Sequence, residues 1–275
     1  MSIAISGSSS QIAANGLRHH LLTYTGGAAG NVVIVPGITS PAATADFIAS
    51  PLAALGFNVF VPDLRGRGQT DTPPSGHYRL TDYASDIAGL ISALGLVRPH
   101  IIGHSLGARI AAAYAAQFCP DDHGMLVIVD PPTSGPGRGS YPTSKEAFLT
   151  QLHAAKRGTT AEEVRKFYPK WQTRELQLRA DVLASCDETA IVETHAGFDQ
   201  EDFFPLWSAL KRPATLIRGE LSPMVPPAAA AELAAANPLI PIVSVPNAGH
   251  MVPWDNFTDF FKILVRLIPR AQQAA

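Results

Sequence analysis

The segment GHSLG sets Ser105 between Gly103 and Gly107, directly after an apolar run and directly before an alanine-rich one. The runs HIIGHSLG (100–107) and ARIAAAYAAQF (108–118) predict a strand that turns sharply into a helix. In such a turn, a side chain at either glycine would collide with the neighbouring strand and helix. The turn aims Ser105 away from the sheet, beside the free N–H groups and the positive dipole end of the helix. Ser105 is therefore predicted to be a catalytic nucleophile.

Short strands alternate with helices on both sides of a middle block. The apolar strands lack polar alternation, which indicates a mostly parallel sheet with helices on both faces. The predicted fold class is therefore α/β. The serine-rich stretch SGSSS near the start is expected to be poorly ordered. Predicted strands, with any turn that follows, cover residues 31–37, 57–68, 100–107, 124–132, 214–220 and 242–250, and predicted helices cover 47–56, 81–95, 108–118, the run PPAAAAELAAANP and 259–268.

The block at residues 133–205 differs from both flanks, because it is mostly helical in pattern and rich in charge. Residues 131–180 hold nine Lys and Arg against four Asp and Glu, whereas residues 181–205 hold seven Asp and Glu and no Lys or Arg. One interpretation is a solvated surface, and the other is that the basic half faces an anionic substrate. We predict a core at residues 1–132 and 206–275 and a helical cap at 133–205, over the sheet edge where ligands of open α/β folds bind.

Composition excludes several classes of protein. The net charge is −2, so binding to nucleic acid or to an anionic membrane is not expected. Cys119 and Cys186 have neither metal-site nor CxxC spacing, which fits a reducing cytosol and predicts a cytoplasmic protein without a disulfide framework. The N-terminal segment lacks Lys, Arg and a long apolar block, so no secretory signal is expected. We expect no metal site, and the sequence leaves the oligomeric state open.

Four motifs, VIVPG, VPDLRGRGQT, GHSLG and NAGHMV, occur in this order and span nearly the whole chain. In these motifs and their order, the sequence resembles the α/β-hydrolase superfamily. The resemblance implies a mostly parallel central sheet flanked by helices. The predicted cap lies where this superfamily inserts one.

The base that a serine nucleophile needs must lie within hydrogen-bond reach of its hydroxyl. Among the nine histidines, His250 follows a predicted strand in the small-residue loop VPNAGHMVPWD, where the superfamily carries its base. His104 is next to Ser105 in sequence and is predicted to point elsewhere and to pack against its neighbours. We therefore predict that His250 is the general base.

The acid of the triad departs from the commonest pattern of the superfamily. Most relatives place it after the strand that precedes the histidine strand, and there the segment RGELSPMVPP has Ser222 instead. Asp130 ends the apolar strand MLVIVD, at a strand end that a minority of the superfamily uses. We predict Asp130 as the acid, with Glu220 and Asp255 as alternatives. Asp63 is predicted to be a turn residue that binds backbone groups.

An oxyanion hole needs two donors where negative charge develops. One predicted donor is the backbone N–H of Leu106, the residue after the nucleophile. The second is the N–H of Ile38, in the loop after the strand NVVIVPG. Relatives have His-Gly in that loop, and this chain has Pro36-Gly37, but a backbone donor survives the loss of the histidine side chain.

Three further features, DPPTSGPGRGSYP, VPGITSP and the basic half of the cap, resemble the small-amide hydrolases of pyridine-ring catabolism. This resemblance implies a deformylase or amidohydrolase that acts on a small anionic amide and needs no cofactor. Cationic or donor side chains should then bind the carboxylate of the substrate. Arg109, on the helix after the nucleophile, is predicted to lie on the helix surface or in a sheet-edge ion pair. The predicted substrate-binding residues are Arg138, Arg157, Arg165, Tyr168, Lys170 and Arg174.

Two alternatives remain open at this point. An esterase or a carbon–carbon hydrolase of ring-cleavage products would prefer aryl esters or vinylogous diketones and would need no cation in the cap. A non-catalytic binding protein on the same fold would bind its ligand tightly with negligible turnover, and the Ser–His pair argues against it.

Overall fold

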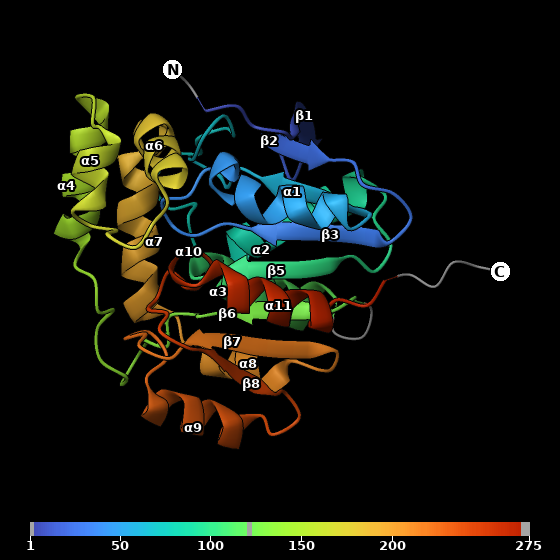
Figure 1. Ribbon diagram of the computed structural model, residues 1–275. Helices are drawn as coiled ribbons and strands as arrows, with labels where there is room; N and C mark the ends of the chain where they lie inside the picture. Colours follow the sequence, from blue (N-terminus) through green and yellow to red (C-terminus); the bar gives the residue numbers. More distant parts are fainter. Residues whose placement is uncertain (1–2, 120–122, 271–275) are drawn as a thin grey trace.

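The computed structural model describes residues 3–119 and 123–270, and all structural statements below concern these residues. Its centre is an eight-stranded sheet with strand order β1-β2-β4-β3-β5-β6-β7-β8 (Figure 1). The neighbours from β4 to β8 pair in parallel, whereas β1 and β2 are antiparallel. The strands are β1 (Ser8–Ala14), β2 (Leu17–Tyr24), β3 (Gly30–Val35), β4 (Phe57–Pro62), β5 (His100–His104), β6 (Leu126–Val129), β7 (Ala214–Gly219) and β8 (Ile242–Val245).

The helices alternate with the parallel strands, as the sequence predicts. Each predicted helix is present, with ends shifted by at most a few residues. The helices are α1 (Asp46–Ala54), α2 (Leu80–Ala93), α3 (Leu106–Phe118), α4 (Lys145–Lys156), α5 (Ala161–Arg165), α6 (Thr173–Val182), α7 (Glu188–Gln200), α8 (Phe204–Ala209), α9 (Pro227–Ala236), α10 (Val252–Asp255) and α11 (Phe257–Leu267), with short 3-10 turns at Ala42–Ala45 and Leu183–Ser185.

Alternate residues of the central strands enter two separate apolar clusters. Val33 and Ile101 lie in a cluster that extends to α2 and α3. Val32 and Ile102 lie in the other, which extends to α1 and α11. Figure 1 shows α1 and α11 in front of the sheet and α2 and α3 behind it. The prediction of a sheet with both faces covered is confirmed, and the double burial explains why these strands lack polar alternation.

The expectation of a poorly ordered N-terminal stretch is wrong. The serines of SGSSS lead into β1, whose backbone pairs with β2 from Ser8 opposite Thr23 to Ala14 opposite Leu17. An edge strand pairs through its backbone and leaves its side chains in water, so a polar composition does not prevent pairing. The turn is Asn15-Gly16, with φ of 47° and 75°. Asn-Gly is a strong hairpin signal, and it was visible in the sequence.

The helices α4 to α7 lie between β6 and β7 in the chain and gather at one end of the sheet (Figure 1). Arg67, which is fully buried, connects them to the rest of the molecule. Its guanidinium donates to the Tyr83 hydroxyl on α2 (2.6 Å) and to the Thr194 hydroxyl (3.1 Å) and the Ala190 carbonyl (3.2 Å) on α7. We keep the name cap for residues 133–205.

The prediction that Arg109 lies on a helix surface is wrong. Its side chain is buried beneath residues 134–201, where it donates to the carbonyls of Ser134, Phe198 and Glu201. The first turns of α3 are covered on every side, and the buried charge is compensated by these carbonyl groups and by the nearby carboxylates of Glu201, Asp202 and Asp199. Arg109 thus helps to fasten the segment that enters and leaves the cap.

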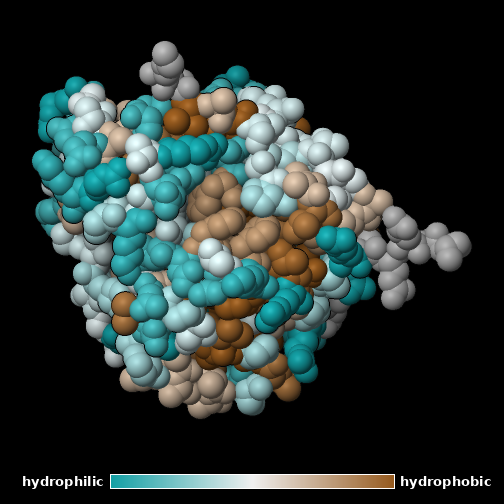
Figure 2. Space-filling view, viewed as in Figure 1, coloured by the Kyte–Doolittle hydropathy of each residue, from teal (hydrophilic) through white to brown (hydrophobic). Residues whose placement is uncertain are grey.

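Apolar side chains gather on the surface over α1 and α11 (Figure 2). Part-exposed aromatic rings meet there, with centroids 5.0 Å apart for Phe47 and Trp254, and 5.1 Å apart for Phe257 and Phe261. Across the described residues, no helix combines the length and the apolarity needed to cross a membrane.

Candidate active site

Ser105 occupies the tight turn between β5 and α3. Its φ of 57° and ψ of −117° lie in a region that residues with a side chain rarely adopt. A Cβ placed on Gly103 would lie 2.1 Å from the Gly107 carbonyl oxygen, and one on Gly107 would lie 1.9 Å from the Val35 carbonyl oxygen at the end of β3. Both distances are far inside van der Waals contact. The steric reason that the sequence suggested for the two glycines is therefore confirmed.

The structure brings Ser105, His250 and Asp130 together from the ends of three different strands. The Ser105 Oγ lies 2.9 Å from the His250 Nε2, and the His250 Nδ1 lies 2.8 Å from the Asp130 Oδ2. Because Asp130 is a fully buried acceptor, the Nδ1–H must point at it, which leaves the Nε2 lone pair for the serine proton. This arrangement can deprotonate Ser105 and stabilise the imidazolium that forms.

Ser222 lies against the Asp130 carboxylate rather than replacing it. Its hydroxyl donates to Oδ2, and the Gly219 N–H donates to Oδ1 over 3.1 Å. Gly219 ends β7, Ser222 follows that strand and His250 follows β8, so three groups donate to the buried carboxylate. The serine at the usual acid position thus helps to hold an acid that lies at the end of the neighbouring strand.

The two alternative acids contact the loop that precedes His250 but not its ring. The Glu220 carboxylate accepts from the Asn247 N–H (3.0 Å), and the Asp255 carboxylate accepts from the Gly249 N–H (2.8 Å). Burial raises the pKa of Asp255 above its ordinary value. Both acids therefore hold the shape of the histidine loop.

The two predicted oxyanion donors come from two different segments of the chain. Leu106 is the first residue of α3, and Ile38 is in the loop after β3 and lines the cavity beside Ser105. Neither N–H donates to a backbone carbonyl of the described chain, so both are available to an oxyanion. The Ile38 peptide is held from its other side, because the Arg67 Nε donates to its carbonyl over 3.0 Å.

Asp63 accepts hydrogen bonds from two backbone groups, as the sequence predicts. The Ala42 N–H donates to one carboxylate oxygen over 2.5 Å, and the Gln69 N–H donates to the other over 2.9 Å. Ala42 begins the 3-10 turn just after the oxyanion loop. Asp63 therefore ties that loop to the segment after β4.

His104 packs behind the base. Its Nε2–H donates to the His250 carbonyl (2.9 Å), and its ring centroid lies 5.1 Å from that of His250 and 5.3 Å from that of Trp254. Burial, reinforced by the neighbouring His250, lowers the pKa of His104 to about 3. The ring is therefore neutral at physiological pH, and it positions the backbone of His250.

A cavity of about 320 Å³ opens over the Ser105–His250 pair. Its wall includes Arg179 on α6, a residue that the sequence interpretation missed. The buried guanidinium donates to the Thr39 carbonyl and hydroxyl and to the Gln151 amide oxygen, each over 3.2 Å. Its Nε has no hydrogen-bond partner in the described part of the chain. The cavity thus holds the predicted nucleophile and base beside a cation that forms no ion pair with a carboxylate of the described residues.

Comparison with known proteins shows the family of this chain. A model of the alpha/beta hydrolase fold matches residues 30–257. The chain belongs to the α/β-hydrolase family. It is a hydrolase, and Ser105 lies within the residues that match the family model.

Two curated relatives and one solved structure are similar to this hydrolase over most of its length. The N-formylmaleamate deformylase of Pseudomonas putida is 40% identical over 91% of this chain and 92% of the relative. The 2-(acetamidomethylene)succinate hydrolase of Mesorhizobium japonicum is 30% identical over 78% of this chain and 80% of the relative. A solved N-formylmaleamic acid deformylase from Pseudomonas putida S16 superimposes with a TM-score of 0.87 at 34% identity, over 94% of this chain and all of that one.

Of the six predicted substrate-binding residues, the structure brings Tyr168 to the catalytic cavity of the hydrolase. Its ring lies beneath Arg179, with the guanidinium carbon 4.9 Å from the ring centroid. Arg179 shares a helix face with Leu176 and Leu183, three residues before and four after it, and both leucines are buried. An arginine inside an apolar helical stripe was the signal in the sequence.

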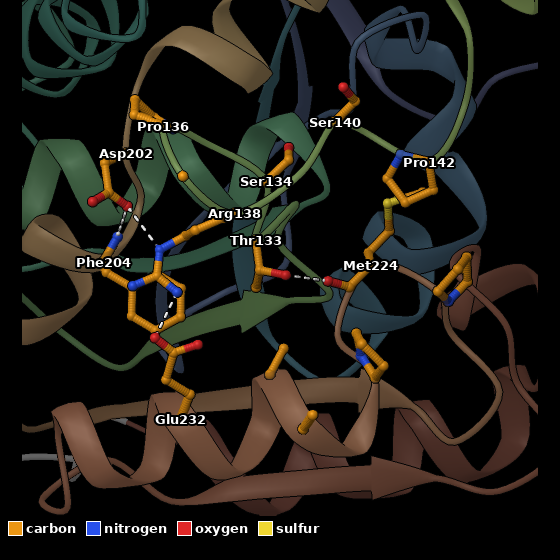
Figure 3. Close-up of a pocket in the computed structure, with 15 residues that line it drawn as sticks. Thr133, Ser134, Pro136, Arg138, Ser140, Pro142, Asp202, Phe204, Met224 and Glu232 are labelled. Carbon is orange, nitrogen blue, oxygen red and sulfur yellow. Dashed lines mark hydrogen bonds and ion pairs between the residues drawn. The ribbon is translucent and has the colours of Figure 1, made fainter.

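The structure places Arg138 in a different and more open pocket of about 650 Å³ (Figure 3). Its guanidinium lies 2.6 Å from the Glu232 carboxylate and 3.6 Å from that of Asp202, over the ring of Phe204. Met224, whose carbonyl accepts from Thr133, lines both pockets. Arg138 is therefore neutralised by two carboxylates and does not face Ser105.

The other four predicted residues lie outside the cavity, each with a different surrounding. Arg157 is exposed at the end of α4. Arg165 pairs with Glu162, and Lys170 donates to the carbonyl of Asn247 over 2.8 Å. Arg174 pairs with Asp46 and Glu175. Among the described residues, no three His, Cys, Asp or Glu side chains form a cluster that could hold a metal ion.

Proposed function

We propose that this hydrolase cleaves the amide bond of a small carboxylate by a Ser105–His250–Asp130 triad, and that its substrate is N-formylmaleamate. Water would convert that substrate to maleamate and formate, a step of aerobic nicotinate breakdown. The name of the 40% identical relative and the resemblance of the sequence motifs both support this substrate. A cytoplasmic location fits a soluble metabolite of this kind.

Arg179 is the observation that carries the proposal. A buried guanidinium without a carboxylate partner is costly, because the desolvated charge is not compensated. Arg179 keeps one donor unused and lies in the same cavity as Ser105. A carboxylate oxygen can accept from this donor, and the charge of the guanidinium strengthens that bond. A substrate with both an amide and a carboxylate can engage Ser105 and Arg179 together, whereas a neutral ester lacks the carboxylate.

The geometry of the triad supports the following mechanism. His250 takes the Ser105 proton as Oγ attacks the formyl carbon, and the N–H groups of Leu106 and Ile38 receive the oxyanion. His250 then passes the proton to the leaving nitrogen, and maleamate departs. Water deprotonated by His250 attacks the formyl ester, and formate leaves as Oγ regains its proton. Asp130 holds the imidazole tautomer in both halves, so these side chains and amides supply the chemistry without a metal or an organic cofactor.

The volume of the cavity also supports a small substrate. About 320 Å³ is near the lower end of the range of ligand pockets, roughly 300–1,000 Å³. Its lining combines aromatic and apolar groups, such as Phe148, with the polar groups of Thr143 and Gln151. A short dicarboxylate half-amide has the size and the polarity that this lining fits.

The test is formate release from N-formylmaleamate by the purified protein, beside Ser105→Ala. We expect turnover by the unmodified protein and loss of at least about 10³-fold in the variant. 2-(Acetamidomethylene)succinate and p-nitrophenyl acetate serve as comparison substrates. If 2-(acetamidomethylene)succinate were turned over faster than N-formylmaleamate, it would replace N-formylmaleamate as the proposed substrate. Cleavage of the ester alone would reject the anionic amide and leave an esterase.

A further inference from the structure

Tyr141 lies over the nucleophile, although neither the motifs nor the triad geometry includes it. It belongs to the segment between β6 and α4, and it lines the cavity while being almost completely buried. Its hydroxyl lies beside the side chains of Ser105 and Thr143. Ser105 Oγ therefore has two polar neighbours, His250 and Tyr141.

The position of Tyr141 is set by groups from the cap. Its ring centroid lies 4.5 Å from that of Phe198 and 5.5 Å from that of His195, both on α7. Its backbone N–H donates to the Asp199 carboxylate over 2.7 Å. The His195 Nε2 lies 2.8 Å from the Thr143 carbonyl. A side chain held at its ring and its backbone has little freedom to leave Ser105.

The part that the phenol can play follows from counting protons. Ser105 has one hydroxyl proton, which points to His250 Nε2 when the base is neutral. Toward Tyr141, Oγ can therefore act only as an acceptor. Burial raises the pKa of Tyr141 well above its ordinary value, so the phenol keeps its proton in the working pH range.

We propose that Tyr141 is a further catalytic residue, a neutral donor that stabilises Ser105 Oγ when this oxygen leaves the acyl-enzyme. The inference rests on the proposed triad and goes beyond it. In deacylation, the oxygen of water bonds to the acyl carbon while the C–Oγ bond breaks, and Oγ departs with the bonding electron pair. The proton that His250 took from water then passes to Oγ. The phenol proton stays on Tyr141 throughout.

The effect on the two half-reactions is unequal. During acylation, a donor on Oγ eases loss of the serine proton but lowers the electron density of the attacking oxygen, so the two effects oppose each other. During deacylation, Oγ gains charge as it leaves, and the donor only helps. Loss of the phenol hydroxyl should therefore slow deacylation more than acylation, whereas a loosened active site would slow both.

Stopped-flow cleavage of p-nitrophenyl acetate by Tyr141→Phe separates the two steps, since the burst reports acylation and the steady state reports deacylation. We expect deacylation to fall about 10- to 100-fold and acylation to change less than about threefold. Acetylated enzyme should accumulate in the intact mass. The matched control is Tyr78→Phe, which removes a hydroxyl bonded to the Pro73 carbonyl (2.6 Å) away from the cavity, and it should behave as the unmodified protein.

Equal loss in both steps, or no loss in either, would overturn the role of Tyr141 while leaving the triad intact. If Ser105→Ala cleaved the ester as fast as the unmodified protein, the triad itself would be wrong and this inference would fall with it. The two failures are thus told apart by one pair of variants.

Discussion

Asp130 has no exposed surface, and the His250 ring, the Ser222 hydroxyl and the Gly219 N–H all converge on its carboxylate. Its own backbone has a φ of 48°, a left-handed conformation that costs about 1–3 kcal/mol in a residue with a side chain. Strain at both Asp130 and Ser105 is characteristic of sites where function, rather than stability, decides the conformation.

Asp130→Asn should lower kcat by about 10⁴-fold, because an amide in place of the carboxylate allows the wrong imidazole tautomer and leaves its cation unpaired. Ser222→Ala keeps the carboxylate and should cost no more than about 10-fold. Formate release measures both, with circular dichroism to show that each variant is folded. A loss in Asp130→Asn no larger than that in Ser222→Ala would show that Asp130 is not the acid of the triad.

Arg179→Gln should lower kcat/KM for an anionic amide by about 10- to 100-fold, because a charge-assisted hydrogen bond is lost. Hydrolysis of neutral p-nitrophenyl acetate should change little. Arg157→Gln, which removes an exposed arginine of the same cap, is the matched control and should lie within about twofold of the unmodified protein. A similar loss on both substrates would assign Arg179 to structure instead.

At the scale of elements, the turn from β5 into α3 depends on the two glycines beside Ser105. In Gly107→Ala, the new Cβ would meet the Val35 carbonyl at 1.9 Å, so α3 and the end of β3 must separate. We expect the free energy of unfolding to fall by more than about 2 kcal/mol, with loss of activity. In Gly27→Ala the nearest atom lies 3.6 Å away, and stability should stay the same or rise by up to about 1 kcal/mol. Urea unfolding of both variants gives the comparison.

His104 makes the packing between β5 and the histidine loop sensitive to pH. Its pKa is about 3 in the folded protein, against an ordinary value near 6.5, so only the unfolded chain takes up its proton between these values. Stability from His104 is therefore complete above about pH 6.5 and falls as the pH falls. His104→Gln should reduce the loss of unfolding free energy between pH 7 and 5 by roughly 2 kcal/mol. An unchanged pH slope in urea titrations would contradict the buried neutral ring.

The parallel strands and their helices were predictable because each has a local pattern, an apolar run of fixed length or a helical repeat. The sequence analysis missed the hairpin of β1 and β2 although Asn15-Gly16 is a turn signal. The serine-rich composition of β1 indicated a poorly ordered segment instead. Ser105 and His250 were predictable from motifs. Tyr141 could not be found that way, since its role comes from α7 holding an irregular segment over a distant turn.

At the scale of the whole molecule, the cavity is built from segments that are far apart in the sequence. Arg67 connects three of them, because its guanidinium contacts the loop after β3, helix α2 and helix α7. Arg67→Met would leave the Ile38 and Ala190 carbonyls and the Tyr83 hydroxyl without their buried donor. We expect a loss of more than about 3 kcal/mol in unfolding free energy and earlier proteolysis within α7. Arg18→Met removes an exposed pair with Asp71 and should cost less than about 1 kcal/mol. Equal stability of the two variants would show that the cap is held by other contacts.

The contact between Ser222 and Asp130 has a consequence for how such enzymes diverge. Changing from one acid position to the other by single substitutions requires either a chain with no acid or a chain with two. Since the two positions touch, an aspartate at each would form a pair that shares one proton. That pair still offers His250 an ionised oxygen. A chain with an aspartate at both positions would therefore keep a carboxylate for His250, so one acid position could be exchanged for the other without loss of the triad.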